Sequence, residues 1–122
     1  MILMDSNIII YVTSGRYPEL TSWFLDNAPS ASAVSKVEVL GYHNLKSAEK
    51  AELERFFSRL NVIYPTAEEF DRAIELRQRH AMSLADALIA ASALHHGLTL
   101  ATHNTKDFEW IKSLEVIDPM PE

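Results

Sequence analysis

Four carboxylates stand in similar surroundings along the chain, each beside a short apolar segment. Asp5 directly follows the apolar run 2–4, and Asp86 lies in "SLADALIAASAL", where almost every other side chain is apolar or small. Glu38 lies in "SKVEVLGY" and Asp107 in "ATHNTKDF". Burying an unpaired charge among apolar groups costs several kcal/mol or more. The placement of these acids therefore requires a physical cause.

One cause would be helix capping. A Ser or Thr three residues before an acid, ahead of an apolar run, is a capping box, and an acid in a first turn also suits the helix dipole. This spacing occurs in Ser83–Asp86 and Ser35–Glu38, and more loosely in Asn104–Asp107. The other cause would be a group of acids that acts together. Spacing alone leaves both explanations open.

The pair Thr66–Glu69 shows how weak the spacing is by itself, because it has the same form and also follows a strand-like segment. We interpret Glu68, Glu69 and Asp71 as a solvated helix face, since polar residues continue beyond them. A further argument is needed to separate Glu69 from the four acids above.

Carboxylates packed together repel one another, and their pKa values rise unless a cation joins them. Oxygen-only ligands suit hard divalent ions such as Mg²⁺ or Mn²⁺. Two such ions can activate water and stabilise the leaving oxygen of a phosphodiester. The functional interpretation of the four acids is therefore metal-dependent hydrolysis of phosphate esters.

The segments that must position these acids alternate between strands and helices. The pattern predicts strands near 2–4, 30–34, 61–64, 98–102 and 114–118, and helices over 17–27, 35–45, 47–60, 67–80, 84–96 and 106–112. Such alternation indicates a parallel sheet with helices on both faces. Ligands of such sheets bind beyond the carboxyl ends of the strands. All four acids can face that edge.

Composition sets broad limits. With 122 residues we expect one domain, 1–122, and the 48% hydrophobic content is ordinary for a globular protein. The net charge of −6 counts against a simple nucleic-acid binder but not against an enzyme with a metal site. The lack of cysteine excludes disulfides and thiolate metal sites. Neither a signal peptide nor a membrane span is evident, and we expect a cytoplasmic protein.

Four segments resemble the motifs of PIN domains, and specifically the toxin nucleases of VapBC toxin–antitoxin pairs. They are "MILMDSNIIIY", "SAVSKVEVLGY", "LADALIAASAL" and "LTLATHNTKDF", and their order and the chain length also fit. The resemblance implies that the metal-binding and catalytic residues are Asp5, Glu38, Asp86 and Asp107. It also implies that Asn7, Thr102 and Asn104 are supporting polar residues. Glu69 matches no motif.

The resemblance implies a three-layer α/β/α sandwich and a Mg²⁺- or Mn²⁺-dependent endoribonuclease. It further implies an RNA substrate, a cognate antitoxin and a homodimer. Members of the family often carry a strong base where His103 stands, so this chain departs from the family there.

Other functions were weighed against this one. A haloacid-dehalogenase-type phosphatase also places an Asp after its first strand, but this chain has Asn7 where the second acid of that motif belongs. A response-regulator receiver would need an Asp after a central strand, which "SASAVSKVE" lacks. A catalytically idle PIN-like binding module remains an alternative, although the presence of all four acids speaks against it.

The remaining polar and aromatic residues have simpler interpretations. The five histidines lack the helical pairing of a zinc site, and we expect surface or capping roles, with His103 alone near the acids. A basic cluster on 67–80 is interpreted as a solvated helix face rather than an RNA-steering patch: Arg72, Arg77, Arg79 and His80. The simplest expectation for Trp23, Phe24, Phe56, Phe57 and Tyr64 is a core position, and the alternative for some of them is a dimer or antitoxin surface.

Overall fold

The computed structural model describes all 122 residues and contains a five-stranded parallel sheet. The strands are β1 (Ile2–Met4), β2 (Ser30–Ser32), β3 (Val62–Ile63), β4 (Thr99–Ala101) and β5 (Val116–Ile117), in the spatial order β3-β2-β1-β4-β5. Strands β2 and β3 thus lie on one side of β1, and β4 and β5 lie on the other side. This reversal of strand order beside β1 is where sheets of this type bind ligands.

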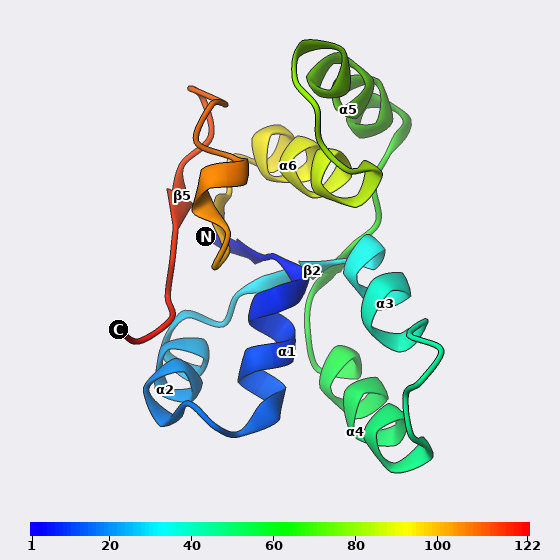
Figure 1. The fold of residues 1–122 in the computed structure, drawn as a ribbon, viewed down its shortest axis with the longest axis vertical. Helices are drawn as coiled ribbons and strands as arrows, with labels where there is room; N and C mark the ends of the chain where they lie inside the picture. The colour runs from blue at the N-terminus through cyan, green and yellow to red at the C-terminus, as the bar shows by residue number, and fades with distance from the viewer.

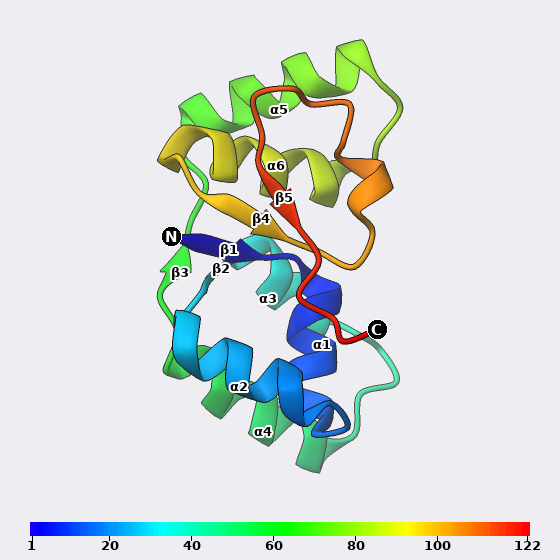
Figure 2. The same ribbon diagram turned by 90° about the vertical axis from the view of Figure 1, so that its left-hand side faces the viewer.

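Six α-helices and one short 3₁₀-helix surround the sheet. They are α1 (Ser6–Ser14), α2 (Pro18–Asn27), α3 (Ala33–Leu40), α4 (Ser47–Ser58), α5 (Ala67–Arg79), α6 (Leu84–His96) and η1 (Thr105–Asp107). Helices α5 and α6 cover one face of the sheet, and α1, α2 and α4 cover the other (Figures 1 and 2). The expected three-layer α/β/α arrangement is confirmed. No helix is long and apolar enough to span a membrane.

Each face of the sheet has its own apolar core. On one side, α6 contributes an unbroken buried segment from Ala87 to Ala93, which packs with Leu3, Leu100 and Phe108. On the other side, Met4, Ile8 and Leu20 lie in a second buried cluster. Alternate residues of β1 therefore serve opposite faces, as the two-residue period of a strand requires. The buried, small-residue helix α6 agrees with the prediction from its sequence.

Local sequence explains several helix boundaries. Pro18 occupies the first turn of α2, where its missing N–H is not needed. Thr66 and Glu69 form a complete capping box at the start of α5. Helix α6 begins after Ser83 and ends at Gly97, whose φ of 65° is the left-handed conformation that glycine adopts at low cost. These boundaries lie within one residue of the predicted ones.

Three expectations about local structure were wrong. Ser35 does not cap a helix, because α3 begins at Ala33 and the Ser32 side chain accepts its capping hydrogen bond from Val34 N. The helix expected over 106–112 is a 3₁₀-turn over Thr105–Asp107 followed by turns. Tyr64 is 67% exposed rather than part of the core.

Candidate active site

Asp5 is held in one orientation at the carboxyl end of the central strand. Its backbone N–H donates to Ala101 O of β4 at 2.8 Å, which continues the β1–β4 ladder by one residue. Its Oδ1 accepts from Ser6 N at 2.8 Å, and its Oδ2 accepts from the Thr102 hydroxyl at 2.8 Å. Thr102 is fully buried and Asp5 nearly so. The carboxylate is therefore fixed before any ligand arrives.

Glu38 is brought to this edge by α3 and oriented by a serine. The Ser6 hydroxyl donates to Glu38 Oε1 at 2.6 Å, and Ser6 Oγ also lies 2.8 Å from Ser35 Oγ. Because a hydroxyl carries one proton, Ser35 is the donor in the second bond. Glu38 is the sixth residue of α3 rather than a first-turn residue, so capping does not explain it. Ser6 thus links the segments that carry Asp5 and Glu38.

Asp86 lies in the first turn of α6, and its carboxylate does not complete a capping box with Ser83. The Ser83 hydroxyl accepts from Asp86 N at 3.0 Å, which satisfies one free backbone donor of the helix. The reciprocal bond from the side chain back to the Ser83 backbone is absent, whereas Glu69 makes that bond to Thr66 N at 3.0 Å. The backbone of Asp86 therefore serves the cap, and its carboxylate stays available to the site.

Asp107 and the supporting polar residues come from the loop after β4. Asp107 is exposed at the end of η1. Asn104 N donates to Thr102 Oγ1 at 3.1 Å, which extends the hydrogen-bond chain from this loop to Asp5. Asn7 Oδ1 accepts from His103 N at 3.4 Å and so ties α1 to the same loop. The His103 ring pairs with Asp118, at 3.0 Å between Nδ1 and Oδ2.

The acids lie close enough for their charges to act on Asp5 and Asp86. Burial raises the pKa of Asp86 to about 6, and the charges of Asp5, Asp107 and Glu38 add to this rise against the opposing effect of Ser83. Burial also raises the pKa of Asp5, with smaller contributions from Glu38 and Asp107, while Thr102 and Ser6 N act in the opposite direction. The structure therefore brings together the four acids that the sequence singled out.

No basic side chain compensates this negative charge. The three ion pairs of the chain all involve histidines with Glu68, Glu69 or Asp118, and none includes one of the four acids. Nor do any three of the four acids have carboxylate oxygens that all lie within 4.8 Å of one another. An all-oxygen donor set without a protein cation fits a hard divalent ion, which would draw the oxygens together.

Sequence reasoning missed two features. Ser6 orients Glu38 and matches none of the predicted site residues; its position directly after Asp5 was the available signal. Glu69 is not part of a solvated face, because its side chain is fully buried while Glu68 is exposed. It lies near His95 and His96 at the far end of α6 from Asp86. No local pattern predicts this cluster, because it joins two helices.

The chain is similar to known proteins over nearly its whole length. Residues 2–113 match the family model of the PIN domain. The chain is 31% identical to "Ribonuclease VapC2" of Haemophilus influenzae over 122 residues, covering 92% of each protein.

Among solved structures, a toxin–antitoxin complex from Klebsiella pneumoniae superposes with a TM-score of 0.84 at 31% identity and covers all of both chains. VapBC2 from Rickettsia felis, bound to a DNA fragment from its promoter, superposes with a TM-score of 0.82 at 25% identity, covering 97% of this chain and 98% of that one. With the parallel sheet, the order of the motifs and the match over nearly its whole length, this chain belongs to the PIN-domain family.

Proposed function

We propose that this protein is a metal-dependent endoribonuclease and the toxin of a toxin–antitoxin pair. The observation that carries the proposal is the group of four acids, Asp5, Glu38, Asp86 and Asp107. Negative charge from this group adds to the burial that raises the pKa values of Asp5 and Asp86, and none of the four acids forms an ion pair with a basic side chain. Its similarity to a protein named as a ribonuclease, over nearly the full length of both, supports RNA as the substrate.

The four acids would hold Mg²⁺ or Mn²⁺, and a metal bound there would activate water and stabilise the departing oxygen of a phosphodiester. The protein's own contribution is positioning. Thr102 and Ser6 N hold Asp5, and the Ser6 hydroxyl holds Glu38. Asp86 projects from a helix whose cap is already satisfied by Ser83. Hydrogen bonds made before binding reduce the reorganisation needed when metal and substrate arrive.

An antitoxin partner is supported by the toxin–antitoxin complexes among the similar structures. A groove of about 630 Å³ borders the site and shares Glu38 with it. Its lining combines exposed apolar side chains, Ile10 and Tyr42, with two further acids, Glu49 and Glu52. This chemistry fits an amphipathic segment that carries basic residues. We place the inhibitory segment of the antitoxin in this groove, with an Arg or Lys directed at Glu38 and its neighbours.

We also propose a homodimer, formed through the outer faces of α5 and α6. Phe70, Ile74 and Leu84 are 49%, 56% and 61% exposed there, and they line one shared hollow. Contiguous exposed apolar surface of this kind marks interaction sites. Light scattering on the purified protein measures its molar mass, and a monomeric mass at micromolar concentration would contradict this assignment.

The direct test of the enzyme is RNA cleavage by the purified protein. Cleavage is expected with Mg²⁺ or Mn²⁺ and is expected to stop in excess EDTA, because the acids alone provide neither an activated water nor a cation. Undiminished cleavage in EDTA would rule out the metal-dependent mechanism.

The same purified protein should also be assayed for hydrolysis of a small phosphate monoester. Release of inorganic phosphate without RNA cleavage would favour the phosphatase alternative, and absence of both activities would favour an idle binding module. The phosphatase alternative gains no support from the structure, since Asn7 occupies the place of the second phosphatase acid and accepts a hydrogen bond from His103 N.

A further inference from the structure

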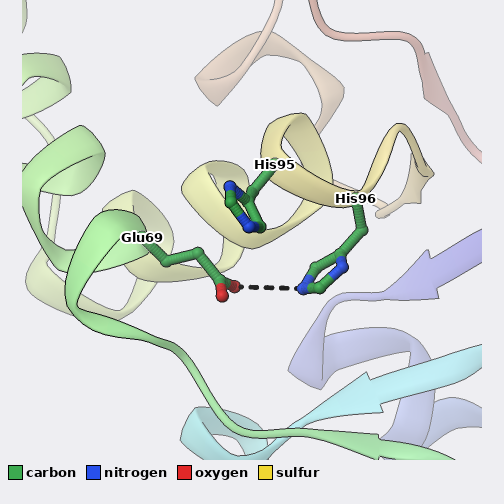
Figure 3. Close-up of side chains that lie close together, drawn as sticks. All are labelled: Glu69, His95 and His96. Atoms are coloured by element: carbon green, nitrogen blue, oxygen red, sulfur yellow. Dashed lines mark ion pairs between the residues drawn. The ribbon is translucent and has the colours of Figure 1, made fainter.

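A second group of metal-ligating side chains lies outside the site described above. Glu69 comes from the first turn of α5, and His95 and His96 come from the last turn of α6 (Figure 3). One ligand atom from each residue lies within 4.8 Å of the others. Ten residues of α6 separate His96 from Asp86, which is about 15 Å along a helix. This cluster is therefore distinct from the four-acid site.

Glu69 is unusual because its side chain is fully buried and only half satisfied. Its Oε2 accepts from Thr66 N at 3.0 Å and from the Thr66 hydroxyl at 2.9 Å. Its Oε1 has no hydrogen-bond partner and is directed at the His96 ring (Figure 3). The buried Ser92 hydroxyl also has no partner in hydrogen-bond geometry, although it lies near enough to Glu69 to help lower the pKa of that carboxyl. A buried charged oxygen with no well-aligned donor is costly, which favours the binding of a cation at this atom.

The distance between Glu69 and His96 is informative. Glu69 Oε1 and His96 Nε2 are 3.5 Å apart, which is longer than the roughly 2.7–2.9 Å of a charge-assisted hydrogen bond. Two ligands bound to one tetrahedral zinc ion at about 2.0–2.1 Å lie roughly 3.3–3.4 Å from each other. The separation is thus long for a charge-assisted hydrogen bond, and it is also the spacing of two neighbouring ligands of one ion.

The types of ligand indicate the class of metal. Two imidazoles and one carboxylate are a set that zinc and similar first-row ions accept, whereas Mg²⁺ prefers oxygen alone. Both histidine side chains are partly exposed, at 33% for His95 and 39% for His96, so an ion can reach them from solvent. Three protein ligands leave one position for water. Exposed Glu68 lies nearby, with its Oε2 3.9 Å from His95 Nδ1.

We propose that Glu69, His95 and His96 form a second metal site, which takes Zn²⁺ or a similar transition-metal ion and joins the start of α5 to the end of α6. The ion would satisfy the free oxygen of Glu69 and link the two helices that cover one face of the sheet. Because the site lies at the opposite end of α6 from the four acids, it takes no part in the reaction proposed for them. The proposal does not depend on the assigned nuclease activity.

The test is zinc binding by the full chain after its metals have been removed with EDTA and dialysis. Calorimetric titration with Zn²⁺ should be made on the Asp86→Asn protein, so that binding at the four acids is weakened. We expect one equivalent of zinc to bind and the thermal unfolding temperature to rise by several degrees, because a ligand that binds only the folded chain stabilises it by mass action. Mg²⁺ alone should produce neither effect.

Matched variants locate the ion. In the same background, His96→Ala and His95→Ala should each weaken zinc binding at least tenfold and abolish the thermal shift. The exposed His43 forms no ion pair, so His43→Ala should change neither. Glu69→Gln can retain a bond to Thr66 while removing the ligand charge, and circular dichroism checks that it folds. Zinc binding that is unchanged in His96→Ala, or no zinc binding by the starting protein, would overturn the proposal.

Discussion

At the scale of single residues, hydrogen bonds hold two carboxylates of the site in place, those of Asp5 and Glu38. The pKa values of Asp5 and Asp86 are raised. Asp5 accepts two hydrogen bonds and is nearly buried, whereas Asp107 is exposed. Asp86 lies between these extremes, and its raised pKa of about 6 reflects burial first and the other acids second. A carboxyl group in this state binds a proton more tightly in the folded chain than in the unfolded chain.

This difference predicts how stability depends on pH in the absence of metal. The pKa of Asp86 rises from 3.8 to about 6 on folding, so the folded chain binds this proton more tightly than the unfolded chain. The resulting stabilisation of the folded state is complete below pH 4 and is lost as the pH rises through 6. Asp86→Asn imitates the protonated form at every pH. In EDTA, the free energy of unfolding of the wild type should therefore fall relative to the variant between pH 4 and pH 7.

The expected change is on the order of 1–3 kcal/mol, and partial exposure of the side chain favours the lower part of that range. Denaturant unfolding of both proteins across this pH interval measures it. A constant difference between the two proteins would show that Asp86 keeps an ordinary pKa.

At the scale of elements, helix α6 has two separable functions at its start. Ser83 stabilises the helix by accepting from Asp86 N, and the Asp86 carboxylate faces the other acids. We expect Asp86→Asn to reduce RNA cleavage by orders of magnitude, because a metal ligand is lost. Its unfolding temperature in EDTA should equal or exceed that of the wild type, and the stabilisation by Mg²⁺ should be smaller.

Ser83→Ala is the matched control, because it removes the cap and leaves all four acids in place. It should lower stability by about 1 kcal/mol with or without Mg²⁺ and retain cleavage. Thermal melting in both buffers, beside one RNA assay, separates the two functions. If Asp86→Asn instead lost stability equally in both buffers and still cut RNA, Asp86 would be a capping residue.

At the scale of the whole molecule, the groove beside Glu38 predicts how inhibition can be separated from catalysis. Tyr42 lines the groove and is 56% exposed, and it is not one of the four acids of the site. Tyr42→Ala should weaken antitoxin binding at least tenfold through lost apolar contact, while RNA cleavage by the free protein stays near the wild-type rate. Calorimetry with the antitoxin and an RNA assay measure the two effects.

Leu25→Ala is a suitable control, since Leu25 is 72% exposed and lines a different hollow beside α4. It should leave antitoxin affinity unchanged. If the wild type and Tyr42→Ala bound the antitoxin with equal affinity, the assignment of the inhibitory segment to this groove would be wrong.

The sequence by itself determined the class of fold and most of the elements, although helix α1 (Ser6–Ser14) was not predicted. Apolar periodicity, Pro18 and Gly97 mark helices whose hydrogen bonds are local, so the boundaries of α2, α5 and α6 could be predicted within one residue. Alternation of strands and helices then indicated a parallel sheet. Resemblance to the PIN motifs, rather than spacing, separated the four acids from Glu69, because the capping pattern is common to both.

Only the tertiary structure decided which residues meet across the sheet and between helices. Ser6 reaches Glu38 across 32 positions of sequence, and Thr102 reaches Asp5 across 97. The burial of Glu69 against the end of α6 follows from the way α5 packs on α6. A local pattern reports the conformation of a few consecutive residues, whereas these contacts depend on how distant segments pack. For that reason Glu69 looked like a solvated acid in the sequence and proved to be a buried one in the fold.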